Sequence, residues 1–335
     1  MDPYTNISLL IPFSVQRTLR SARLLLALLM VGLLVGCSSG DAEVEAELLS
    51  AERRLDELQK SLSSGSLRNA SIISEYSRVL KKDRPDLSPL LSVLAKEATL
   101  ENPLYVSLRH RFDGVKNGTE RFDSWTEKVV ELQSIQTASD TAVFNDAMSD
   151  TVNVIADLSG GSLARVNAVS KESELAMNNA KDQGGGSQYV GNPHYGHWSH
   201  GSGGSFWAWY GQYAFFSSML GGRSHYYNNW AGSRGYSYYH DTGRNSFSSR
   251  SQKSGMQDVE QRSRKQFGSS GKFKSPYART RSGASGMSRA STAQRKSLFN
   301  SPYAKSGSSS KSTSKFQSST RSSGFRTSKG ASRGK

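Results

Sequence analysis

The chain has 335 residues, a formal net charge of +15 and a single cysteine. Because one cysteine can form neither an intrachain disulfide nor a Cys-based zinc site, both are excluded. Only 35% of the residues are hydrophobic, below the roughly 45–50% typical of a globular domain, so we expect part of the chain to remain unfolded.

An export signal is predicted over residues 1–36. Arg17, Arg20 and Arg23 precede an apolar run at residues 24–36. This run of 13 residues is shorter than the about 20 that a membrane-spanning helix needs, and its length suits the core of a signal peptide.

The sequence around the only cysteine resembles the lipobox of bacterial lipoproteins. Leu34, Val35 and Gly36 come directly before Cys37, and two serines follow it. The resemblance implies that the thiol of Cys37 receives diacylglycerol, that cleavage occurs in front of it, and that residues 37–40 form a lipidated tether. Two or three acyl chains, at about 0.8 kcal/mol per buried CH₂, make a stable membrane anchor. No Asp follows at the second mature position, which in enterobacteria-like lipoproteins implies the outer membrane rather than the inner one.

A helical domain is predicted over residues 41–183. Segments with helical periodicity follow one another there, and none alternates like a strand. The clearest is an a/d seam with spacings of four and three, formed by Val44, Leu48, Ala51, Leu55, Leu58 and Leu62. The expected fold class is therefore mainly α, as a small helical bundle or a coiled coil that binds a protein partner or associates with itself. A long, largely disordered C-terminal half is expected to follow.

A Gly-, aromatic- and His-rich segment of low complexity is predicted over residues 184–247. It contains His194, His197 and His200 at intervals of three residues. Imidazoles can bind Zn, Cu or Ni, and His-rich tracts often bind metal. Because no scaffold that would orient these ligands is evident, we expect no cofactor and keep metal binding by the three histidines as an alternative.

A disordered, basic, Ser-rich tail is predicted over residues 248–335. Only seven of its 88 residues are Leu, Ile, Val or Phe, too few to offset the conformational entropy that folding would remove. Its 20 Lys and Arg face only two acids, a composition that favours binding to polyanions. After export, the available anions are lipopolysaccharide phosphates, anionic lipids and acidic cell-wall polymers. Nucleic acid would be a partner only outside the cell, or if the lipobox were coincidental.

One short repeat lies in this tail. Residues 273–279 (FKSPYAR) recur as residues 299–305 (FNSPYAK), and the two copies hold every proline and tyrosine of the tail. We interpret them as a duplicated docking motif, and a tandem duplication without a receptor is the alternative. The expected anchors of the motif are Phe273, Pro276, Tyr277, Phe299, Pro302 and Tyr303.

The sequence contains none of the common catalytic motifs. We find no G-x-S-x-G elbow, phosphate-binding loop, H-E-x-x-H or Rossmann fingerprint. The leading hypothesis is therefore a non-enzymatic, lipid-anchored protein of the cell envelope whose cationic tail binds anionic polymers or lipids. The alternatives are a metal-binding envelope lipoprotein and a non-exported nucleic-acid-binding protein.

Overall fold

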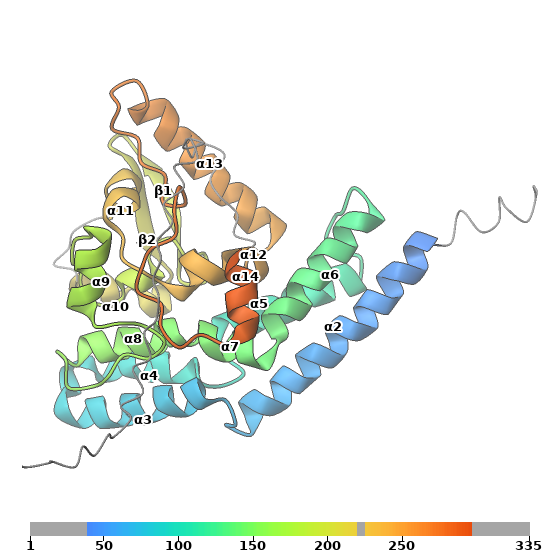
Figure 1. The fold of residues 1–335 in the computed structure, drawn as a ribbon, viewed down its shortest axis with the longest axis horizontal. Coiled ribbons are helices and arrows are strands. Elements are labelled where there is room, and N and C mark those ends of the chain that lie inside the picture. The colour runs from blue at the N-terminus through green and yellow to red at the C-terminus, as the bar shows by residue number, and fades with distance from the viewer. Residues whose placement is uncertain (1–38, 220–224, 297–335) are drawn as a thin grey trace, which may run out of the picture. The chain divides into compact units, whose positions relative to one another are not determined.

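The computed structural model describes residues 39–219 and 225–296 (Figure 1). The fold of this part is mainly α, as the hydrophobic periodicity predicts. All described residues belong to one compact unit of the chain. The predicted signal peptide, Cys37 and the second copy of the repeat at residues 299–305 lie outside the described residues.

The secondary-structure elements in the first half of the described chain are all helices. Several of its helices begin where the sequence supplies a capping side chain: the side chains of Asn102, Ser124 and Asp140 accept hydrogen bonds from backbone N–H groups of the helices that follow them. The elements are α2 (Ser39–Ser63), α3 (Arg68–Asp83), η1 (Pro85–Leu87), α4 (Ser88–Lys96), α5 (Pro103–Lys116), α6 (Trp125–Ser139), α7 (Thr141–Ala147), α8 (Ser149–Leu158) and α9 (Lys171–Asn178).

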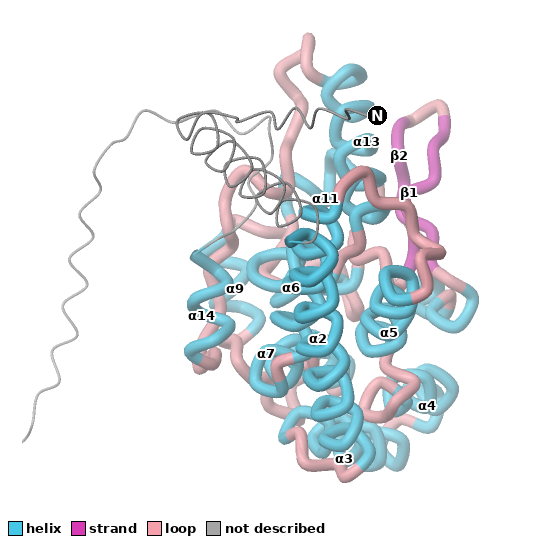
Figure 2. The backbone as a smooth tube through the Cα atoms, turned by 90° about the vertical axis from the view of Figure 1, so that its right-hand side faces the viewer, coloured by secondary structure: helices cyan, strands magenta, loops and turns pink. Residues whose placement is uncertain are grey.

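Helices α2, α5 and α6 lie side by side (Figures 1 and 2). The predicted a/d seam of α2 faces this bundle, and Ala51, Leu55, Leu58 and Leu62 are at most 4% exposed. The seam therefore stabilises a bundle within one chain, and a coiled coil between chains is not confirmed. None of the described helices is long and apolar enough to cross a bilayer.

The second half of the described chain combines short helices with one β-hairpin. Strands β1 and β2 pair antiparallel, with Trp198 opposite Trp207. The elements are η2 (Ser187–Tyr189), β1 (Gly196–Gly201), β2 (Gly204–Trp209), η3 (Gly211–Tyr213), α10 (Phe215–Met219), α11 (Tyr227–Ser233), the π-helical turn η4 (Tyr239–Gly243), α12 (Arg244–Phe247), α13 (Arg250–Phe267) and α14 (Arg289–Lys296).

The predicted disorder of residues 184–296 is not confirmed by the structure. Aliphatic residues are scarce in this part of the chain, but aromatic side chains are buried instead. They pack into the same core as the helices of the first half. The rings buried there are those of Tyr189, Tyr195, Tyr213, Phe216, Tyr238, Tyr239 and Phe247. Helix α13 also begins with a capping box, in which the side chains of Ser249 and Gln252 each accept a hydrogen bond from the other residue's backbone N–H.

Candidate functional site

One deeply buried acid of the described chain is surrounded by hydroxyl groups. Glu97, directly after α4, is 1% exposed, and its carboxyl accepts hydrogen bonds from one threonine and three tyrosines. The oxygen–oxygen distances are 2.6 Å to Thr151, 3.0 Å to Tyr195, 3.1 Å to Tyr213 and 3.3 Å to Tyr189. Burial raises the pKa of Glu97 to about 7, although the four hydroxyl groups favour its charged form. The cluster joins α4 and α8 to residues 189–213.

A second buried acid accepts hydrogen bonds from the backbone at the start of η4. Asp150 of α8 accepts hydrogen bonds from the backbone N–H groups of Tyr238 (2.7 Å) and Tyr239 (3.0 Å) and from the hydroxyl of Ser237 (3.1 Å). Burial raises its pKa to about 7, against these hydrogen bonds. Like Glu97, Asp150 therefore connects the first half of the chain to the second.

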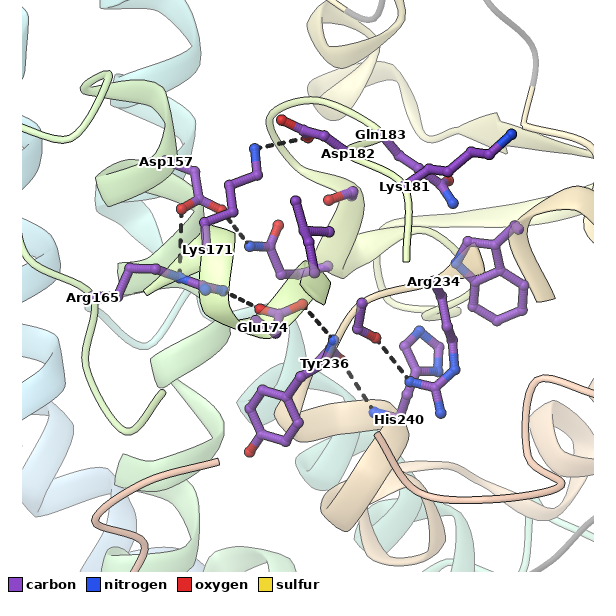
Figure 3. A pocket seen from close by; sticks show the side chains of 16 residues that line it. Asp157, Arg165, Lys171, Glu174, Lys181, Asp182, Gln183, Arg234, Tyr236 and His240 are labelled. Atoms are coloured by element: carbon purple, nitrogen blue, oxygen red, sulfur yellow. Dashed lines mark hydrogen bonds and ion pairs between the residues drawn. The ribbon is translucent and has the colours of Figure 1, made fainter. Parts of the chain in front are cut away.

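A small polar cavity lies between α8, α9 and η4 (Figure 3). Arg165 crosses it, with its guanidinium 2.8 Å from the Glu174 carboxylate and 3.4 Å from the Asp157 carboxylate. The ring of His240 donates from Nε2 to the backbone carbonyl of Val190 at 2.9 Å, which leaves Nδ1 as an acceptor without a hydrogen-bond partner in the described structure. The cavity volume of about 20 Å³ is enough for a water molecule but not for a substrate.

The three histidines of the predicted metal site are placed in different surroundings. His194 is buried, with Nδ1 2.7 Å from the side-chain oxygen of Asn192, and burial lowers its pKa to about 3. His197 and His200 are exposed on β1, where an odd spacing sends their side chains to opposite faces of the strand. Within the described residues, no three His, Cys, Asp or Glu are placed to share a metal ion. Metal binding by these histidines remains an untested prediction.

A cationic surface lies at the end of α13 and on the loop that follows it. All its side chains are exposed, and the sequence contains no Asp or Glu from residue 261 to residue 335. Asp258 and Glu260 are the last acids before it, and Glu260 is buried. The cationic surface consists of Arg262, Arg264, Lys265, Lys272, Lys274 and Arg279.

Two hollows border the cationic surface. The larger has a volume of about 450 Å³ and lies between His200 at the end of β1 and the side chains of Arg262 and Lys265. The smaller has a volume of about 300 Å³, and Tyr226 and Lys272 are among its lining residues. Guanidinium and ammonium groups in such open positions can donate hydrogen bonds to phosphate or carboxylate groups.

The first copy of the repeat is docked on its own chain. Pro276 and Tyr277 are buried, and Phe273 is half-buried. The other expected anchors, Phe299, Pro302 and Tyr303, lie outside the described residues.

Sequence reasoning found the charge of the cationic surface but not the buried carboxyl groups. Glu97 and Asp150 have no recognisable sequence signal, because their hydrogen-bond donors lie between 54 and 116 residues away along the chain. The only available hint was an unusual number of tyrosines in residues 184–247, whose hydroxyls need partners when buried. Comparison of the chain with protein-family models, curated protein sequences and solved structures gives no match.

Proposed function

We propose that the protein is a non-enzymatic, lipid-anchored component of the cell envelope that binds an anionic polymer or lipid. The cationic surface carries this proposal. It presents Lys and Arg at fixed positions on a folded core, and the described structure gives no ion pair to Arg262, Lys265, Lys272, Lys274 or Arg279. These cations are therefore available to a partner instead of being neutralised by the chain itself.

The sequence after the cationic surface extends the same chemistry. Residues 261–335 contain eighteen Lys and Arg and no acid, and eight of these lie in residues 297–335. We propose that residues 297–335 add charge along a polyanion while the cationic surface fixes the point of attachment. Each cation that meets a phosphate or carboxylate releases counterions, so binding should weaken steeply with salt.

The start of α2 is suited to a lipid anchor on Cys37. Helix α2 begins at Ser39, so its first Cα lies within about 7.6 Å of the Cα of Cys37 along two peptide units. The Trp125 ring packs against Gly40, where a Cβ would come 2.9 Å from it, yet 45% of Trp125 is exposed. Tryptophan is enriched at membrane–water interfaces. An acylated Cys37 would thus bring an exposed indole to the depth of the lipid headgroups.

The helical body offers a further surface for a protein partner. Helices α2, α5 and α6 each expose one aliphatic side chain by more than half: Leu49, Val106 and Val130. Singly scattered apolar residues are common on protein surfaces, so the body is a secondary part of the proposal.

The proposal divides into two tests. Intact mass spectrometry of the protein from membranes should give a chain that begins at an acylated Cys37, and an unprocessed, unacylated chain in the cytosol would contradict the lipid anchor. Binding is tested on the purified protein with polygalacturonate, polyphosphate and phosphatidylglycerol vesicles over a range of salt concentrations. At least one of these probes should bind with strong salt dependence.

Charge reversal at the cationic surface provides the residue-level test. The double variant Arg262→Glu with Lys265→Glu should weaken binding and reduce the salt slope by about two. The control is Arg68→Glu with Lys82→Glu, which makes the same charge change on the exposed side of α3. Equal loss of affinity in both variants would mean that net charge, and not this surface, determines binding.

A further inference from the structure

The first copy of the repeat, residues 273–279, lies in a groove formed by other residues of the same chain. Tyr277 is 6% exposed, and the guanidinium carbon of Arg244 lies over its ring, 3.7 Å from the centroid. The tyrosine hydroxyl is 3.6 Å from the sulfur of Met256. Cation–π and sulfur contacts of this kind favour an aromatic ring with a hydroxyl at this position.

Polar groups of the groove hold the backbone that precedes this ring. Arg234 donates from Nε to the carbonyl of Pro276 at 3.0 Å, while its other two nitrogens bind the Asp241 carboxylate at 2.7 and 2.8 Å. The Asn228 amide donates to the carbonyl of Lys272 at 2.7 Å and accepts from the N–H of Lys274 at 2.8 Å. We call this binding surface the repeat groove and define it by Asn228, Arg234, Arg244 and Met256.

The second copy of the repeat retains what the repeat groove contacts. Five of the seven positions are identical in residues 273–279 and 299–305, including the proline and the tyrosine. The two changes replace Lys274 by Asn300 and Arg279 by Lys305. The side chains of Lys274 and Arg279 are exposed, and the hydrogen bond of Lys274 to Asn228 is made by its backbone N–H. An asparagine at this position can donate the same backbone hydrogen bond.

The chain is long enough for the second copy to reach the same groove. Arg295 of α14 donates to the carbonyl of Arg281 at 3.1 Å, and Arg281 is four residues from Tyr277, at most about 14 Å of extended chain. Eight residues separate Arg295 from Tyr303, which can span about 26–29 Å. The length available exceeds the distance to be covered by more than the length of the Arg295 side chain. The second copy can therefore reach the repeat groove of its own chain.

We propose that the repeat groove is a binding site for the F-x-S-P-Y-A-(R/K) sequence and that residues 299–305 compete with residues 273–279 for it within one chain. Replacement of the first copy by the second releases Lys274 and Arg279 of the cationic surface from their fixed positions. This inference rests on the repeat and on the contacts of its first copy, and it does not depend on the lipid anchor or on an anionic partner.

Tyrosine substitutions in the full-length chain test the competition. Tyr303→Ala alone should leave the melting temperature unchanged, because the first copy occupies the groove. Tyr277→Ala should lower it, and the double variant should melt about 3 °C lower still, because Tyr303 no longer substitutes. A peptide of residues 297–307 should raise the melting temperature of the double variant, and the same peptide with Tyr303→Ala should not. Equal melting of Tyr277→Ala and the double variant, with no peptide effect, would overturn the proposal.

A second measurement reports contact instead of stability. A photoreactive benzoylphenylalanine at position 303 of the Tyr277→Ala chain should cross-link to Met256, since benzophenones react readily with methionine. The product should have the mass of one chain. A cross-link between two chains would overturn the assignment to one molecule, and absence of any cross-link to residues of the repeat groove would overturn the shared site.

Discussion

The burial of Glu97 predicts that this carboxyl's contribution to stability is lost as the pH rises through neutrality. In the unfolded chain this carboxyl has an ordinary pKa of 4.5, whereas in the folded chain burial raises the pKa to about 7. The folded state therefore binds the proton more tightly. The contribution to stability is fully present below about pH 4.5 and is lost as the pH rises to about 7.

The size of this effect follows from the two pKa values. One pKa unit corresponds to about 1.4 kcal/mol, so the difference between 4.5 and about 7 is worth about 3 kcal/mol. Asp150 acts in the same direction, because burial raises its pKa from 3.8 to about 7. These two contributions should fall between pH 5 and pH 8, whereas burial lowers the pKa of His194 and His240 to about 3, so the cost of keeping these two rings neutral declines as the pH rises over the same range.

Urea unfolding of a Glu97→Gln variant isolates the contribution of this one group. Glutamine does not titrate, and its amide can donate to the tyrosine oxygens as well as accept from them. Relative to the variant, the native protein should lose about 3 kcal/mol of unfolding free energy between pH 5 and pH 8, and the other buried titratable groups, Asp150, His194 and His240 among them, act equally in both proteins. Glu101→Gln, an exposed acid in the loop after α4, is the matched control and should keep the native slope. An identical pH dependence in native protein and Glu97→Gln would refute the reasoning, because it would show that the four hydroxyls keep the carboxyl ionised.

Three further substitutions test other parts of the fold by chemical denaturation or hydrogen exchange. Leu55→Ala should cost about 2–5 kcal/mol of unfolding free energy in urea, because Leu55 is fully buried in the bundle seam. Asp241→Ala should cost about 3–5 kcal/mol by leaving the Arg234 guanidinium buried without its partner, and Asp241→Leu with Arg234→Met should cost less than that single change. Ser249→Ala should speed amide exchange in the first turn of α13 by a factor matching about 1 kcal/mol, whereas exposed Ser254→Ala should not.

The helices of the first half could be predicted because periodicity reports burial directly. The a/d seam from Ala51 to Leu62 is buried as its spacing predicts, and Asn102 and Ser124 cap the helices that follow them. These are local signals, which a single sequence contains in full. The repeat was also visible, but its receptor was not, because Arg234 and Arg244 give no sign in sequence that they face Pro276 and Tyr277.

The disorder predicted for the second half of the described chain is not confirmed, and the reason is physical. The expectation of disorder in residues 248–335 rested on the scarcity of Leu, Ile, Val and Phe. In the structure Arg234 is 4% exposed and forms an ion pair with Asp241. Arg111 is 2% exposed and binds the Glu131 carboxylate and the carbonyl of Ser246. Paired arginines and stacked rings thus take the place of an aliphatic core, and such pairs form between residues far apart in sequence.

The same buried groups determine how the cationic surface relates to the helix that begins next to Cys37. Glu97, Asp150 and Arg111 all belong to the helical first half, yet each meets partners from residues 189–246. A charged group stripped of such partners is costly to keep buried, so the first half cannot retain its packing without the second. Helix α2 and the cationic surface are therefore parts of one core. An anchor at Cys37 would then hold the cationic surface through packed structure.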